Sequence, residues 1–115
     1  MNNNVGKFFW GPAIWKTIHC LCAAYTPDQR DHIKSFMHEL RYLLPCGYCR
    51  DHYDDNLKKL PISDYLSNNH NLFLWSYFLH DMVNKQLGKT SPPYDVVKAA
   101  YFKGMGPECT SCKLT

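Results

Sequence analysis

The sequence lacks the features that mark membrane-spanning, secreted and nucleic-acid-binding chains. No apolar stretch approaches the roughly 18–20 residues that a spanning helix needs. The first residues, Met1-Asn2-Asn3-Asn4, are polar, and the apolar core of a signal peptide does not follow them. The 13 Lys and Arg residues barely outnumber the 10 Asp and Glu residues, and basic residues form no run of five or more. We therefore expect neither membrane association nor a nucleic-acid partner.

Strand patterns are also absent, whereas apolar residues are as abundant as in a folded domain. The 115 residues are 45% hydrophobic and 20% charged, which suits one globular domain over 1–115. No segment alternates polar and apolar residues in the manner of a strand. Apolar residues instead recur at helical spacing, most clearly at Ile33, Phe36, Met37, Leu40, Leu43 and Leu44. We predict an all-α fold, a four-helix bundle with a short fifth helix.

Proline, glycine and capping residues divide the chain into its predicted helices. The first opens at Trp10-Gly11-Pro12, with Pro12 in the first turn. The second begins at Thr26-Pro27-Asp28-Gln29, where Thr26 and Gln29 can form a capping box. We expect the first helix to run to about residue 25, the second over 27–44, the third from the Cys46-Gly47-Tyr48-Cys49 string to about residue 60, and the last two over about 72–87 and 94–102. A loose arm over 1–9, a loop over 61–71 and a tail over 104–115 complete the chain.

Four of the six cysteines form two C-x-x-C pairs, Cys46 with Cys49 and Cys109 with Cys112. Where thiols are kept reduced, such pairs more often bind metal or perform redox chemistry than bridge a structure. Cys46 and Cys49 are about one helical turn apart at a predicted helix start, so both sulfurs can face the same side and bridge. The positive end of the helix dipole stabilises a thiolate, which is the nucleophile in disulfide exchange. We interpret the pair as a redox-active disulfide.

Two alternatives compete with this interpretation. The two C-x-x-C pairs could share one zinc ion, or the first pair could be structural. Zinc is disfavoured by the long separation, positions 50 to 108, and by the helical context of the first pair. A thioredoxin-type unit needs strands, which the sequence does not predict. A helical thiol enzyme without a second redox group of its own requires a cofactor.

Three strings of residues carry a resemblance to a known family. They are Trp10-Gly11-Pro12-x-x-Trp15-x-x-x-His19, then Cys46-Gly47-Tyr48-Cys49, then Trp75-x-x-x-x-His80-Asp81-Met82-Val83-Asn84-Lys85-Gln86-Leu87-Gly88-Lys89. Together they resemble the Erv/ALR family of FAD-linked sulfhydryl oxidases, over about residues 10–101. The resemblance implies a helical bundle that binds FAD non-covalently, usually as a homodimer. It also implies oxidation of thiols in protein substrates, with electrons passing to oxygen and giving hydrogen peroxide.

The resemblance also implies roles for single residues. Cys49 is implied to be the flavin-proximal cysteine, and Cys46 the one that receives electrons from the substrate or a shuttle disulfide. The residues implied to contact FAD are Gly11, Trp15, His19, Cys49, His52, Trp75, His80, Asn84, Lys89 and Tyr101, with Tyr25 a weaker candidate.

The spacing of several of these residues suits a pocket independently of the resemblance. His80, Asn84 and Leu87 share one face of a predicted helix, and Trp15 and His19 are one turn apart. Lys89 is a plausible partner for the phosphates of a dinucleotide. No G-x-G-x-x-G follows a strand, so FAD would not be bound in a Rossmann manner.

The remaining cysteines set this chain apart from many cellular members of the family. No cysteine lies between Cys49 and Cys109, so the structural disulfide of those members is absent. The compact plan looks more like the oxidases of large DNA viruses, which suggests a host cytoplasm or a virion. The resemblance implies that Cys109 and Cys112 form a shuttle disulfide, although a structural bridge or a metal half-site is an alternative. Cys20 and Cys22 point to different sides of a helix, and we expect both to be buried and free.

Two other functions remain open at this point. A zinc-binding helical adaptor would use both C-x-x-C pairs, and would be colourless and unfolded by a chelator. A structural subunit could keep the flavin pocket without turnover.

Overall fold

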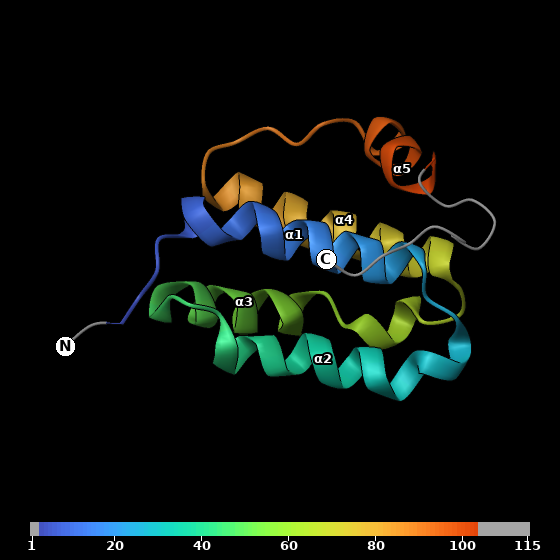
Figure 1. Ribbon diagram of the computed structural model, residues 1–115, viewed down its shortest axis with the longest axis horizontal. Coiled ribbons are helices and arrows are strands. Elements are labelled where there is room, and N and C mark those ends of the chain that lie inside the picture. Colours follow the sequence, from blue (N-terminus) through green and yellow to red (C-terminus); the bar gives the residue numbers. More distant parts are fainter. Residues whose placement is uncertain (1–2, 104–115) are drawn as a thin grey trace, which may run out of the picture.

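The computed structural model describes residues 3–103, and within that range all regular structure is helical. The five α-helices are α1 (Lys7–Ala23), α2 (Arg30–Leu43), α3 (Gly47–Lys59), α4 (Asn69–Gln86) and α5 (Tyr94–Lys103), with two short 3-10 turns, η1 (Pro27–Gln29) and η2 (Ile62–Tyr65). Figure 1 shows α1 beside α4 and α2 beside α3, with α5 lying across one end of the α1–α4 pair. The predicted all-α fold of four longer helices and a short fifth is confirmed.

The second predicted helix illustrates how local sequence produces these elements. The side-chain oxygen of Gln29 accepts a hydrogen bond from the Thr26 amide at 3.2 Å, which is half of the predicted capping box. In the helix that follows, Ile33, Met37 and Leu40 are buried at the predicted spacing. Gly88, just after α4, adopts a φ of +71°, a backbone conformation that glycine reaches without strain.

The core lies between the two helix pairs and is filled by large apolar side chains. Phe73, Trp75, Leu72 and Leu79 of α4 are fully buried, and Met37 of α2 faces them across the bundle. Burying such side chains stabilises the fold by roughly 1.5–3 kcal/mol each relative to exposure. The core therefore fixes how α4 is rotated, and with it which of its side chains face elsewhere.

Three predicted boundaries were wrong. Helix α1 begins at Lys7, so Pro12 lies inside the helix rather than in its first turn. The predicted loose arm is tied down instead, because the Val5 amide donates to the Pro45 carbonyl at 2.7 Å. Helix α4 begins at Asn69, where the Asn68 side chain caps the Asn71 amide, and η2 occupies part of the predicted loop before it.

None of the helices between residues 3 and 103 combines the length and apolarity that crossing a bilayer requires.

Candidate active site

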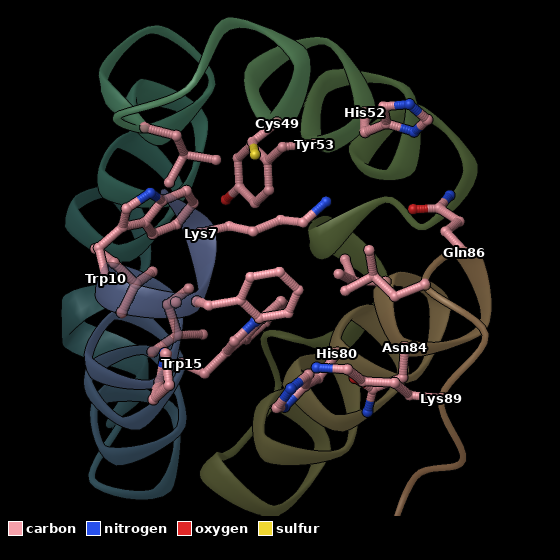
Figure 2. A pocket seen from close by; sticks show the side chains of 18 of the residues that line it. Lys7, Trp10, Trp15, Cys49, His52, Tyr53, His80, Asn84, Gln86 and Lys89 are labelled. Atoms are coloured by element: carbon pink, nitrogen blue, oxygen red, sulfur yellow. The ribbon is translucent and has the colours of Figure 1, made fainter. Parts of the chain in front are cut away.

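A pocket of about 470 Å³ opens between α1, α3 and α4, a volume within the roughly 300–1,000 Å³ of small-molecule sites. Figure 2 shows side chains from these helices converging on it. The lining residues are Lys7, Phe8, Trp10, Gly11, Pro12, Ile14, Trp15, Lys16, Ile18, Leu44, Tyr48, Cys49, His52, Tyr53, His80, Val83, Asn84, Gln86, Leu87, Lys89 and Tyr101. Apolar and aromatic groups with a few cations suit a flat, anionic ligand.

One wall of the pocket is a pair of stacked rings. The Trp15 indole and the His80 imidazole lie with their ring centroids 4.1 Å apart and their planes within 6° of parallel. Tyr101 of α5 also lines the pocket, and its ring centroid lies 5.3 Å from that of His19. Aromatic surfaces in this arrangement present flat faces on which another ring can stack.

His80 is held from behind by His19, which is buried and does not line the pocket. The His19 Nε2 and His80 Nδ1 atoms are 2.9 Å apart, and the His19 Nδ1 atom is 2.9 Å from the Ser76 hydroxyl. Burial, assisted by the nearby His80, lowers the pKa of His19 to about 4. Burial and the Lys89 charge lower the pKa of His80, with Asp81 opposing them. Both rings are therefore neutral at pH 7.

A second network places Lys89 at the pocket. The Asn84 side chain donates to the Ser91 hydroxyl at 3.0 Å, and that hydroxyl donates to Asp81 at 2.7 Å. The Lys89 amide donates to the Asn84 carbonyl at 2.7 Å. These bonds fold the segment after α4 back onto the helix, so the Lys89 ammonium group lies at the pocket although its residue lies beyond the helix end.

The two cysteines sit at the start of α3, as predicted, and differ in their access to the pocket. Cys46 is the N-cap of α3, and its sulfur accepts a hydrogen bond from the Cys49 amide at 3.2 Å. The two Sγ atoms are 2.6 Å apart, with both cysteines free. Cys49 lines the pocket and Cys46 does not.

The same geometry moves the two thiol pKa values in opposite directions. Burial raises the pKa of Cys46, but hydrogen bonds from the Cys49 thiol and from the Cys49 and Tyr48 amides, with the Lys7 charge, outweigh it and hold that pKa below its usual value. Burial, together with the hydrogen bond to Cys46 and its charge, raises the pKa of Cys49 to about 11. In the reduced pair, Cys46 is therefore the first to lose its proton.

Lys7 is a pocket residue that sequence reasoning missed, because it lies in the segment predicted to be a loose arm. Figure 2 shows its side chain extending into the pocket between Cys49 and Trp15. The Lys7 Nζ atom lies 5.7 Å from the centroid of the Tyr48 ring, and its charge lowers the pKa of both cysteines. No local signal marked it, because the hydrogen bond between Val5 and Pro45 just before α1 joins distant parts of the chain.

The structure brings most of the predicted cofactor residues to one pocket and excludes three. Gly11, Trp15, Cys49, His52, His80, Asn84, Lys89 and Tyr101 all line it. His19 lies behind His80. Trp75 is fully buried in the core, where its indole donates to the Leu60 carbonyl at 2.9 Å. Tyr25 is also buried and donates to the Leu66 carbonyl.

The expectation for the other cysteines is partly corrected. Cys22 is fully buried and free, and burial raises its pKa to about 12, with the neighbouring Ser76 hydroxyl opposing the shift. Cys20 is free but exposed, because it lies on the outer side of α1. Cys109 and Cys112 lie outside the described residues. Within 3–103, no three His, Cys, Asp or Glu side chains are grouped to hold a metal ion.

Known proteins match this chain over most of its length. The Erv1 / Alr family model matches residues 12–102. A probable FAD-linked sulfhydryl oxidase, R368, of Acanthamoeba polyphaga mimivirus is 35% identical over 104 residues, which cover 86% of this chain and 73% of the relative. The FAD-linked sulfhydryl oxidase of African swine fever virus (isolate Tick/Malawi/Lil 20-1/1983) is 30% identical over 80% of this chain and 79% of its own length. The FAD-linked sulfhydryl oxidase ERV1 of Arabidopsis thaliana is 32% identical over 90% of this chain and 55% of its own length.

Proposed function

The chain belongs to the Erv1 / Alr family and is an FAD-linked sulfhydryl oxidase, and we propose that Cys46 and Cys49 are its redox-active pair, with FAD bound in the pocket that Cys49 lines. The observation that carries this proposal is the position of Cys49. Cys49 lines the same pocket as the stacked Trp15 and His80 rings. Its Sγ atom is also 2.6 Å from that of Cys46, close enough for the two to form a disulfide.

The residues of the pocket fit FAD in shape and in charge. Gly11 is buried and lines the pocket, and a Cβ atom built on it would meet no side chain within 4 Å, so it would project into open pocket space. Trp15, His80 and Tyr101 provide faces for a flat ring system. Lys89 provides a cation for the phosphates, and Asn84 and His52 provide polar atoms for directed hydrogen bonds.

FAD, when bound, supplies the chemistry that accepts two electrons from a dithiol, which side chains alone do not provide. The protein's own part begins with the disulfide between Cys46 and Cys49. A substrate thiolate attacks the Cys46 sulfur, the bond between the two cysteines breaks, and Cys49 leaves as a thiolate. A second substrate thiolate then attacks the substrate sulfur of the mixed disulfide. This releases Cys46 as a thiolate and the substrate as a disulfide, so two electrons have moved to the pair.

The thiol pKa values assign different tasks to the two cysteines. The raised pKa of Cys49 results from burial and then from its hydrogen bond and proximity to Cys46. When Cys46 is held in a mixed disulfide it carries no charge, so it no longer raises the pKa of Cys49 by repulsion. The pKa of Cys49 then falls, and Cys49 becomes a better leaving group. Cys46 outside the pocket meets the substrate, and Cys49 delivers electrons inside it.

The decisive experiment compares three serine variants by flavin absorbance and by oxygen uptake with dithiothreitol. Cys49→Ser and Cys46→Ser should purify yellow, with wild-type FAD content, and should lose turnover by at least about a hundredfold, because no disulfide can form. Cys20→Ser is the matched control, since Cys20 is exposed on α1 and remote from the pair's hydrogen bonds, and it should keep full activity. Sustained turnover by Cys49→Ser would overturn the assignment.

The finer aspects of the reaction are proposals of the same kind. Oxygen is the proposed electron acceptor, giving hydrogen peroxide, and the thiols of proteins are the proposed substrates. We also propose that the active form is a homodimer, which sedimentation of the yellow protein would test. The proposed location is a host cytoplasm or a virion, on the analogy with viral relatives. The zinc-adaptor alternative has no support, because the relatives are named as oxidases and the described residues form no metal site.

The tail pair, Cys109 and Cys112, is proposed as a shuttle disulfide between substrate and Cys46. Changing both to serine should slow oxidation of a reduced protein such as denatured ribonuclease and should spare dithiothreitol oxidation. Equal rates of the variant and the wild type with the protein substrate would contradict the shuttle.

A further inference from the structure

A buried chain of polar atoms connects the pocket face of His80 to the interior of α4. It runs from the His80 Nδ1 atom to His19 at 2.9 Å, from His19 to the Ser76 hydroxyl at 2.9 Å, and from that hydroxyl to the Phe73 carbonyl at 2.7 Å. Ser76 is fully buried and His19 is 2% exposed, so water does not replace these partners. Each contact holds one hydrogen atom, and its position can be deduced from the end of the chain.

Ser76 determines where the first hydrogen lies. Two oxygen atoms 2.7 Å apart require a hydrogen between them, and the Phe73 carbonyl has none to give. The Ser76 hydroxyl therefore donates to Phe73 and has no second hydrogen for His19. Cys22 also lies beside Ser76, but its raised pKa keeps it a thiol, so it does not need that hydrogen. The contact between Ser76 and His19 must then use a hydrogen on His19 Nδ1.

The hydrogen position on His19 determines the hydrogen position on His80. A neutral imidazole carries a single ring hydrogen, and burial keeps His19 neutral by lowering its pKa to about 4. With that hydrogen on Nδ1, the Nε2 atom of His19 is an acceptor. The hydrogen in the contact between the two rings therefore belongs to His80 Nδ1. His80, which is neutral as well, is left with an unprotonated Nε2 atom that has no partner among residues 3–103.

We propose that His19 and Ser76 are positioning residues that hold His80 in its Nδ1–H form, so that the Nε2 atom of His80 accepts a hydrogen bond from the pocket's ligand. The inference rests on the proposed function for the identity of that ligand. Of the groups in FAD, the amine, ring N–H and hydroxyl groups can donate to such an atom, whereas the phosphate oxygens cannot. The phosphates are then left to cations such as Lys89, which lines the same pocket.

The first test is a direct measurement of the hydrogen position, with no variant required. Long-range ¹H–¹⁵N correlation spectra of the holoenzyme at pH 7 distinguish the two neutral forms of each histidine ring. We expect His80 and His19 both in the Nδ1–H form. A spectrum showing His80 in the Nε2–H form would overturn the proposal.

The second test uses one substitution to reverse the direction of the hydrogen bond between His19 and His80. Ser76→Ala leaves the His19 Nδ1 atom without an acceptor, so the His19 hydrogen should move to Nε2, where it can donate to His80. His80 should then switch to the Nε2–H form, and the Kd for FAD should rise about tenfold, which corresponds to about 1.4 kcal/mol. An unchanged His80 spectrum and an unchanged Kd would contradict the relay.

Two substitutions of His19 separate hydrogen bonding from packing. His19→Gln keeps an acceptor oxygen near the position of Nε2 and should keep the His80 form and most of the FAD affinity. His19→Leu fills the space without an acceptor and should lose both. Equal FAD affinities of the two variants would show that His19 contributes only packing. A wild-type protein that binds no FAD would instead refute the proposed function while leaving the NMR result intact.

Discussion

The rings of Trp15 in α1 and His80 in α4 lie parallel within 6°, with their centroids 4.1 Å apart, and both residues line the pocket. Neither helix provides this surface alone, because each contributes a single ring. The stack therefore depends on the packing of α1 against α4, and it links the stability of the bundle to the shape of the site.

Removing the indole should weaken FAD binding without unfolding the chain. Trp15→Ala deletes a pocket wall and the stacking partner of His80, and we expect the Kd for FAD to rise about tenfold or more. Trp15→Phe should retain most of the affinity. Titration of apoprotein with FAD, followed by flavin fluorescence, measures both. Phe9→Ala is the control, because Phe9 is 85% exposed and does not line the pocket. Wild-type FAD affinity in Trp15→Ala would show that the stacked rings do not contact FAD.

Filling the space beside Gly11 should separate stability from binding. Gly11→Ala places a methyl group in open pocket space and removes a glycine from α1, so the apoprotein should gain about 0.5–1 kcal/mol of unfolding free energy. The same methyl group should weaken FAD binding, and Gly11→Leu should abolish it. Urea unfolding and FAD titration test the two effects. Gly6→Ala, just before α1 and outside the pocket, should leave affinity unchanged. An unaffected Gly11→Leu variant would show that the ligand does not approach α1 here.

Lys7 should control the reactivity of Cys46. Its charge is one of the causes that hold the pKa of Cys46 below the usual value, so Lys7→Met should raise that pKa and reduce the thiolate fraction at neutral pH. The rate of Cys46 alkylation by iodoacetamide, measured against pH on the reduced protein and resolved by mass spectrometry, reports this directly. The midpoint should move to higher pH in Lys7→Met and stay in place in Lys34→Met, because the Lys34 charge is not among the causes that shift either cysteine's pKa. Coincident profiles for Lys7→Met and wild type would show that the charge does not reach the thiol.

The buried His19 should make the apoprotein less stable in acid. Its pKa is about 4 in the folded chain and about 6.5 when unfolded, so between these values the unfolded state binds more protons. Stability is therefore full above pH 6.5 and falls as the pH drops towards 4, by about 3 kcal/mol from this residue. Urea unfolding at pH 7.5 and 4.5 should show a larger loss for wild type than for His19→Gln. Identical losses would mean that His19 is not buried in its neutral form.

Some features of this protein follow from the sequence because they depend on neighbours along the chain. The apolar spacing from Ile33 to Leu44 predicts α2, and Thr26 and Gln29 predict its start. The pair at Cys46 and Cys49 was expected at a helix start, and Gly88 at a helix end. Helical periodicity and capping, which involve residues within a few turns of each other, determine all of these. The family strings predicted most of the pocket wall for a related reason, since they preserve positions on helix faces.

Helix geometry alone could have corrected one of the predictions, the placement of Trp75 in the pocket. Trp75 and His80 are five residues apart in α4, about 140° around the helix, so they could not both face one pocket. Leu72 and Leu79 flank Trp75 on the buried side, which assigns the indole to the core. Lys7 was missed because the start of α1 depends on contacts between Val5 and Pro45, and these join distant parts of the chain.

The sequence by itself determined the helical fold, some of the helix ends, the C-x-x-C pair at the start of α3 and the residue types available to a flavin site. Only the tertiary structure decided that His80 lines the pocket while His19, one helix away, lies behind it. It also decided that Cys49 lines the pocket and Cys46 does not. The physical reason is that a side chain's direction depends on how its helix is rotated, and the burial of residues such as Phe73 and Leu79 against the other helices sets that rotation.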